Sequence, residues 1–254
     1  MHRSREGDFL ETNDNFIFDV KGIVHPPDRV IAYLRYVPDE KGGRTRFGVR
    51  YRKVYALSGR EAFLRENAPY YLYFDSIAHR RLQGVPLEKI KILYEPKKKL
   101  EELLAKRSFD RIERDTLGLV ELLRSATGLD SGRFGVSGSL LVGLHDENSD
   151  IDLMVYGVRE SHKVLDALKG SQHDTLIERY DKAGIERLYE ARSMRNAMSF
   201  NRFMMHEKRK FLEGRFRTRD YFIRCIKDWN EIKEKYGDRS YYPLNSCIIE
   251  AVVE

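Results

Sequence analysis

One stretch of the chain, GVSGSLLVGLHDENSDIDLMVYG from Gly135 to Gly157, limits most strongly what the protein can fold into. Its last part alternates in polarity and is the most strand-like run in the sequence. Asp150 and Asp152 fall on one face of that strand, because successive side chains alternate between the two faces. Two carboxylates on one face repel each other, so the pattern indicates that another group compensates their charge.

The same stretch begins with a turn that suits anions. Gly138 allows a tight turn, and Ser139 can cap a short helix over 140–144, where backbone N–H groups and a hydroxyl face a phosphate. Carboxylates two residues apart on a strand can converge on Mg²⁺, which proteins hold with one or two carboxylates plus substrate phosphates. Each feature alone also fits an ordinary capped helix or an exposed strand end. Together they predict a Mg²⁺–triphosphate site between neighbouring strands.

Gly138-Ser139, followed after ten residues by Asp-Ile-Asp-Leu at 150–153, resembles the signature of the DNA polymerase beta-like nucleotidyltransferase superfamily. The whole chain looks like an archaeal group of predicted nucleotidyltransferases, which have stretches similar to FDVKGIVHPPDRVIAYLRYVP and YLYFDSIAHRRLQGVP. The resemblance implies a nucleotidyltransferase-fold C-terminal domain. It also implies transfer of a nucleoside monophosphate from a triphosphate such as ATP to an acceptor hydroxyl, with pyrophosphate leaving.

The resemblance also assigns roles to individual residues. Gly138 and Ser139 would hold the nucleotide phosphates, and Ser149, in the turn before the strand, is assigned to the same nucleotide site. Asp150 and Asp152 would ligate Mg²⁺ or Mn²⁺. A third carboxylate on a later strand would help to activate the acceptor hydroxyl.

Two residues compete for the role of that third carboxylate. Asp220 lies in the β-prone run TRDYFIRCI, as a catalytic and metal-binding candidate, whereas Glu250 lies in the apolar run CIIEAVV near the end of the chain. Asp220 could instead merely pair with Arg217 or Arg219 at a strand edge. A missing third carboxylate would favour a non-catalytic nucleic-acid-binding or regulatory protein on a degenerate transferase fold. An antitoxin-like enzyme that modifies another protein with a nucleotide is a further alternative.

The charge of the chain favours a polyanionic partner such as RNA. The net charge is +6 and the pI is about 9.1, and residues 202–227 hold nine Lys or Arg against three acids. On one strand, Arg215, Arg217 and Arg219 would share a face and could meet phosphates. A solvated helix followed by a salt-bridged strand explains the same residues equally well. A second basic strand at 44–53 fits a charge-protected sheet edge.

The order of elements predicts a mixed α/β or α+β chain with two domains, 1–96 and 97–254. The first is strand-rich, with strands at 16–20, 29–37, 44–57 and 70–74, a hairpin turn at 42–43, and helices at 58–68 and 85–96. The second has helices at 97–107, 109–128, 161–170, 185–194 and 200–214. Its strands are expected near 134–136 and 150–155, over 215–228 and at 245–254.

The remaining composition excludes several classes of protein. Cys225 and Cys247 are too few for a disulfide scaffold, and no Cys-x-x-Cys pair indicates zinc. The polar N-terminus does not look like a signal peptide, and no apolar run is long enough to cross a bilayer. We therefore expect a cytoplasmic protein without a membrane partner. The scarcity of glutamine, with only Gln83 and Gln172, resembles that of heat-adapted proteins.

Overall fold

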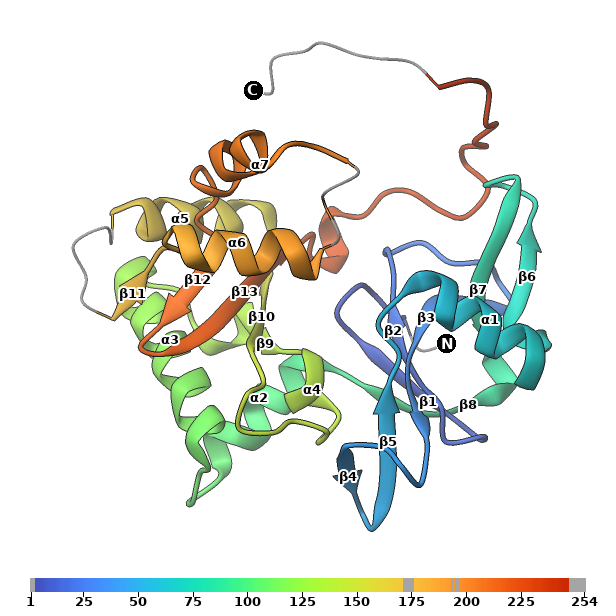
Figure 1. Cartoon of the computed structure of the whole chain (residues 1–254), viewed down its shortest axis with the longest axis horizontal. Helices are drawn as coiled ribbons and strands as arrows, with labels where there is room; N and C mark the ends of the chain where they lie inside the picture. Colours follow the sequence, from blue (N-terminus) through green and yellow to red (C-terminus); the bar gives the residue numbers. More distant parts are fainter. Residues whose placement is uncertain (1–2, 171–175, 193, 195–196, 247–254) are drawn as a thin grey trace.

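The computed structural model describes residues 3–170, 176–192, 194 and 197–246. These residues form seven α-helices and two β-sheets, so the expected mixed α+β class is confirmed. Figure 1 shows the two sheets in separate halves of the molecule, with the first half in blue to teal and the second in green to red. Glu250 and most of the strand expected over 245–254 lie outside the described residues.

The N-terminal half is built on an antiparallel sheet. Its strands are β1 (Phe9–Thr12), β2 (Ile17–Val20), β3 (Arg29–Pro38), β4 (Arg44–Arg46), β5 (Val49–Lys53), β6 (Leu72–Asp75), β7 (Arg80–Pro86) and β8 (Ile90–Tyr94). They pair in the order β4-β5-β3-β2-β1-β8, with β7 on β3 and β6 on β7. Helix α1 (Leu57–Asn67) buries Leu64 in the same apolar cluster as Phe18, Leu34 and Tyr71.

Two local expectations for this half are wrong. The segment 85–96, expected to be a helix, is the end of β7, one 3-10 turn and then β8. β8 pairs with β1, and this pairing of an apolar, β-branched run outweighs local helix propensity. The strand expected over 44–57 is the hairpin β4–β5, which turns at Phe47 and Gly48 with φ of 49° and 78°. Residues 42–43 lie before this hairpin, in the connection from β3.

The C-terminal half has a five-stranded sheet in the order β11-β12-β13-β10-β9. The strands are β9 (Phe134–Val136), β10 (Ile151–Tyr156), β11 (Ile177–Glu178), β12 (Glu213–Phe216) and β13 (Arg219–Ile226). Only β10 and β13 run parallel, with Ile151 opposite Tyr221. The single strand expected over 215–228 is wrong, because Arg217, with φ of 58°, turns the chain between β12 and β13.

Helices cover this second sheet. They are α2 (Pro96–Ala105), α3 (Arg111–Thr127), α4 (Gly138–Leu141), α5 (Val158–Gly170), α6 (Lys182–Ala191) and α7 (Phe200–Glu207). The longest, α3, starts at a capping box of Asp110 and Glu113 and ends at Gly128, whose φ is 69°. Its apolar side enters the core that contains Leu123 and Leu153. This packing fixes α3 beside β10.

The chain passes twice between the halves. Its start lies against the C-terminal half, where Ser137 Oγ donates to the Gly7 carbonyl (2.6 Å) and the Arg5 guanidinium lies 3.9 Å from the Tyr156 ring centroid. After β13 the chain returns to β6 and β7 (Figure 1), where Tyr236 Oη donates to Asp75 (3.0 Å). The chain leaves the first sheet at Tyr94 and enters the second sheet at Phe134, yet Arg5 and Tyr236 each contact the opposite half.

We predict a pH-dependent stability from Asp8, at this junction. Burial, with a smaller effect of the Glu95 charge, raises the pKa of Asp8 to about 7, although Arg5 partly opposes this. The unfolded chain therefore loses this proton at lower pH than the folded protein does. The contribution of Asp8 to the free energy of unfolding should fall by about 1.4 kcal/mol per pH unit from about 4 to about 7.

Urea unfolding of the wild type and Asp8→Asn across this pH range measures the effect. Asparagine keeps an oxygen for the Arg5 N–H, which Asp8 accepts at 2.9 Å. The variant should lose the downward trend that the carboxyl group causes. Parallel pH profiles of the two proteins would contradict the assignment.

Candidate functional site

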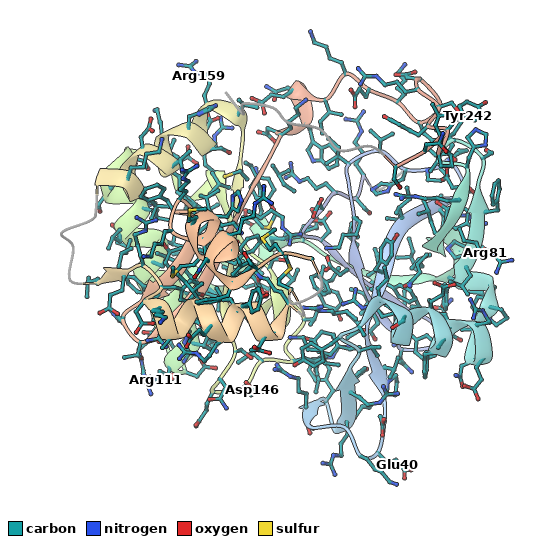
Figure 2. The ribbon with its side chains drawn as sticks, turned by 45° about the horizontal axis from the view of Figure 1, so that its top comes forward. Glu40, Arg81, Arg111, Asp146, Arg159 and Tyr242 are labelled. Carbon is teal, nitrogen blue, oxygen red and sulfur yellow. The ribbon has the colours of Figure 1, made fainter. Side chains whose placement is uncertain are left out.

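A cavity of about 720 Å³ lies where the two halves meet. The N-terminal half contributes Arg44, Lys53 and Tyr55 to its wall. The C-terminal half contributes residues from the loop before β10, from α6 and from the β12–β13 hairpin, among them Asp150, Asp152, Tyr180, Arg192, Arg215, Arg219, Asp220 and Phe222. In Figure 2 the loop labelled at Asp146 lies beside the β4–β5 hairpin of the other half. Both sheets therefore build the cavity.

The structure brings Gly138 and Asp152 into close contact. Gly138 has a φ of 65°, and a Cβ atom placed on it would lie 1.8 Å from Asp152 Oδ2. The strands β9 and β10 bring the two residues together, and Ser137 N–H donates to the Asp152 carbonyl (2.8 Å). Only glycine fits here, for both its φ and its lack of a side chain. The turn and the aspartates are thus neighbours at one end of the sheet.

Ser139 does not cap a helix as expected. The short helix α4 begins at Gly138, so Ser137 occupies the capping position, and Leu144 N–H donates to the Ser139 carbonyl (2.9 Å). The Ser139 hydroxyl is buried and has no hydrogen-bond partner in the part of the chain that the structure describes. An unsatisfied buried hydroxyl costs about 1–3 kcal/mol, although Ser139 is not among the residues that line the cavity.

The two aspartates lack partners as well. Neither the Asp150 nor the Asp152 carboxylate takes part in a hydrogen bond or ion pair with any residue in the described ranges. Burial and, next to it, the charge of Asp150 raise the pKa of Asp152 to about 7, although Arg224 and Arg35 partly oppose this. The protein alone therefore leaves the repulsion between the two carboxylates uncompensated. A bound cation would relieve it.

A divalent cation fits this donor set only together with a ligand. Among the residues that the structure describes, no three Asp, Glu, His or Cys side chains gather closely enough to hold a metal ion. Two carboxylates supply oxygen ligands, and Mg²⁺ commonly completes its shell with water and substrate phosphates. Asp150 and Asp152 therefore suit a cation that arrives with a phosphate compound.

Asp220 reaches the cavity but does not complete a metal cluster. The parallel pairing of β10 and β13 places Asp220 beside Asp150, and both line the cavity. The Asp220 carboxylate, however, pairs with Arg215 of β12 (Nε–Oδ1 3.2 Å). An ion pair at a strand edge was the expected alternative, although with Arg217 or Arg219 as the partner.

The three arginines do not share one strand face. Arg215 lies on β12, Arg217 in the hairpin turn and Arg219 on β13. Arg217 and Arg219 both pair with Asp115 of α3, at 3.0 and 3.2 Å. The expectation of a common cationic face is wrong because the chain turns within the segment. All three side chains have carboxylate partners, which agrees with the salt-bridged alternative.

Arg219 has a second role that the sequence did not indicate. Its Nη1 donates to the carbonyls of Glu147 (2.8 Å) and Ser149 (2.6 Å), in the loop that leads into β10. Its side chain is only 7% exposed, so these bonds and its ion pair with Asp115 are shielded from water. Arg219 therefore helps to position Asp150, which directly precedes β10.

Arg44 holds the same loop from the other half of the molecule. It donates to the Leu144 carbonyl and to Ser149 Oγ (3.1 Å), and pairs with Asp146 (3.0 Å). Ser149 Oγ also accepts from the Asp146 N–H (2.9 Å). These bonds occupy the Ser149 hydroxyl, but Ser149 also lines the cavity, so its contact with a nucleotide stays a prediction.

The fold and the cavity define a class, namely an α+β protein with a cavity between its two sheets. Two of the carboxylates that line this cavity have no partner among the described residues. No protein-family model matches the chain, and no solved structure matches it. The chain is 30% identical to the uncharacterized protein MJ1086 of the methanogen Methanocaldococcus jannaschii, over 97% of its own length and 75% of that protein. The chain belongs to the family of MJ1086. None of the described helices is both long and apolar enough to cross a membrane.

Proposed function

We propose that the protein is a Mg²⁺- or Mn²⁺-dependent nucleotidyltransferase. The observation that carries this proposal is the close approach of Gly138 to Asp152. Beside it lie the Ser139 hydroxyl and the Asp150 carboxylate, which have no partner among the described residues. A cavity of about 720 Å³ is within the usual range for a small-molecule site. Nucleoside triphosphate with its cation is the ligand that satisfies both the carboxylates and the hydroxyl.

Each residue then has a separate task. Asp150 and Asp152 hold the cation, which when bound offsets the negative charge of the phosphates. The Ser139 hydroxyl donates to a phosphate oxygen, and the lack of a side chain at Gly138 leaves room for the Asp152 carboxylate. The acceptor oxygen attacks the α-phosphorus, the bond to the bridging oxygen breaks, and pyrophosphate leaves. Asp220 is the candidate base for the acceptor proton once its ion pair with Arg215 opens.

Ser139→Ala tests the nucleotide site. We expect weaker binding of Mg²⁺–ATP by isothermal calorimetry, by about tenfold, because a hydroxyl that serves the ligand is lost. The free energy of unfolding should stay equal or rise slightly, since the variant removes an unsatisfied buried group. Ser137→Ala is the matched control: it loses the bond to Gly7 and should lower stability while ATP affinity stays. Unchanged ATP affinity in Ser139→Ala would contradict the assignment.

The reaction itself is tested by transfer of label. The protein is incubated with Mg²⁺, each α-labelled nucleoside triphosphate, and either total RNA or cell lysate. Label should enter one macromolecular fraction, and removal of the cation with EDTA should abolish this. Label in RNA identifies a hydroxyl on RNA as the acceptor, whereas label in protein identifies the protein-modifying alternative.

A non-catalytic nucleotide-binding or regulatory protein is a second candidate. One observation favours it: among the described residues, no three carboxylates lie close enough together to hold a metal ion. Such a protein would bind Mg²⁺–ATP in calorimetry but would transfer no label to any fraction. Absence of both binding and transfer would reject the nucleotide site altogether.

A further inference from the structure

Lys53 is a half-buried cation that pairs with no carboxylate among the residues that the structure describes. It ends strand β5 of the N-terminal sheet and lines the shared cavity. Its ammonium lies 4.8 Å from the Tyr55 ring centroid and forms no ion pair with a residue in the described part of the chain. Partly buried charges are normally paired, so a partner from outside the protein is indicated.

The charges around Lys53 show where that partner would lie. Burial lowers the pKa of Lys53, and nearby Arg35 and Arg44 lower it further, whereas Asp150 and Asp152 oppose this. The lysine is thus close enough to the two aspartates to interact electrostatically, yet no ion pair joins them. Lys53 and the two aspartates therefore line one cavity from different halves of the molecule.

The other cations of the wall are already engaged. Arg192, Arg215 and Arg219 pair with carboxylates of the same half. Arg44 is held by Asp146, and the exposed Arg111 donates to the Thr218 hydroxyl. Among the described residues that line the cavity, Lys53 is therefore the half-buried cation whose charge is available to a ligand.

We propose that Lys53 binds the terminal phosphates of the nucleoside triphosphate, so that the N-terminal sheet supplies the positive wall of the site. This inference rests on the proposed function. A nucleoside triphosphate carries more negative charge than one divalent cation neutralises, and lysine is a common point-charge partner of phosphate. The same contact would hold the pyrophosphate that leaves, so Lys53 would act on the part of the substrate that a monophosphate lacks.

Calorimetry with two nucleotides tests the proposal. Mg²⁺–ATP and AMP are titrated into the wild type, Lys53→Met and Lys53→Arg. Methionine keeps the apolar stem but removes the charge, so ATP affinity should fall by about 10- to 100-fold while AMP affinity stays within about twofold. Arginine should keep most of the ATP affinity. Lys169→Met, at an exposed position of α5 outside the cavity lining, should bind ATP as the wild type does.

Each outcome separates this inference from the proposed function. ATP affinity unchanged in Lys53→Met, or ATP and AMP weakened equally, overturns the role of Lys53 and leaves the nucleotide site intact. A wild-type protein that binds no nucleotide rejects both proposals. Urea unfolding of each variant shows that it is folded, and Lys53→Gln replaces Lys53→Met if the latter is not.

Discussion

Asp152→Asn should abolish nucleotidyl transfer and at the same time stabilise the protein. The loss of a cation ligand should reduce the rate by about 10²-fold or more, as for other charge-stabilising groups in active sites. The free energy of unfolding should rise by about 1 kcal/mol at pH 8, because the amide removes a buried charge and its repulsion with Asp150. The gain should be smaller at pH 5, where the raised pKa already keeps folded Asp152 protonated.

Opposite changes in activity and stability distinguish a binding carboxylate from a structural one. Transfer of label and urea unfolding are measured on the same preparations at both pH values. Asp166→Asn, on the exposed part of α5, is the control and should alter neither quantity. Wild-type activity in Asp152→Asn would reject its role in the reaction, and a loss of stability would show that the carboxylate has a partner within the fold.

Arg219→Met should lower the free energy of unfolding by about 2–4 kcal/mol, more than any other substitution named above. The substitution leaves buried Asp115 with Arg217 as its remaining partner and removes the donor to the carbonyls of Glu147 and Ser149. Breaking a buried ion pair from one side is costly because the other charge stays desolvated. Urea unfolding measures the loss. Transfer activity should fall too, since the loop before Asp150 loses one of its anchors.

Arg217→Met is the matched control for this prediction. Arg217 pairs with the same Asp115, but its side chain is 46% exposed, so its loss should cost about 1 kcal/mol or less. Equal, small losses of stability in the two variants would mean that burial of the Arg219–Asp115 pair does not contribute to stability. Equal, large losses would mean that Asp115 needs both partners.

Local patterns predicted the elements that depend on local chemistry. The alternation after Asp150 is strand β10, and the helix expected over 109–128 is α3, which ends at Gly128 as expected. The expected helix over 85–96 failed because pairing of β8 with β1 is decided by residues about 80 positions away. The single strand expected over 215–228 was wrong because the chain turns at Arg217. Arg217 has a positive φ but, unlike glycine, gives no sign of a turn in the sequence.

The site could be predicted only in its local part. The spacing of Gly138 and Asp152 was visible in the sequence, and the structure makes them neighbours. Arg44 and Lys53 were missed because their place at the cavity depends on how the two halves dock. A basic hairpin on a strand-rich half gives no local sign of the loop it contacts 100 residues later.

The loop before β10 has anchors in both halves, Arg44 in one and Arg219 in the other. A fragment that contained either half alone would keep only one of these anchors. The carboxylates could then no longer be presented in a fixed position. The two halves should therefore melt in one transition, and the binding activity should disappear from isolated halves and return when complementary fragments reassemble.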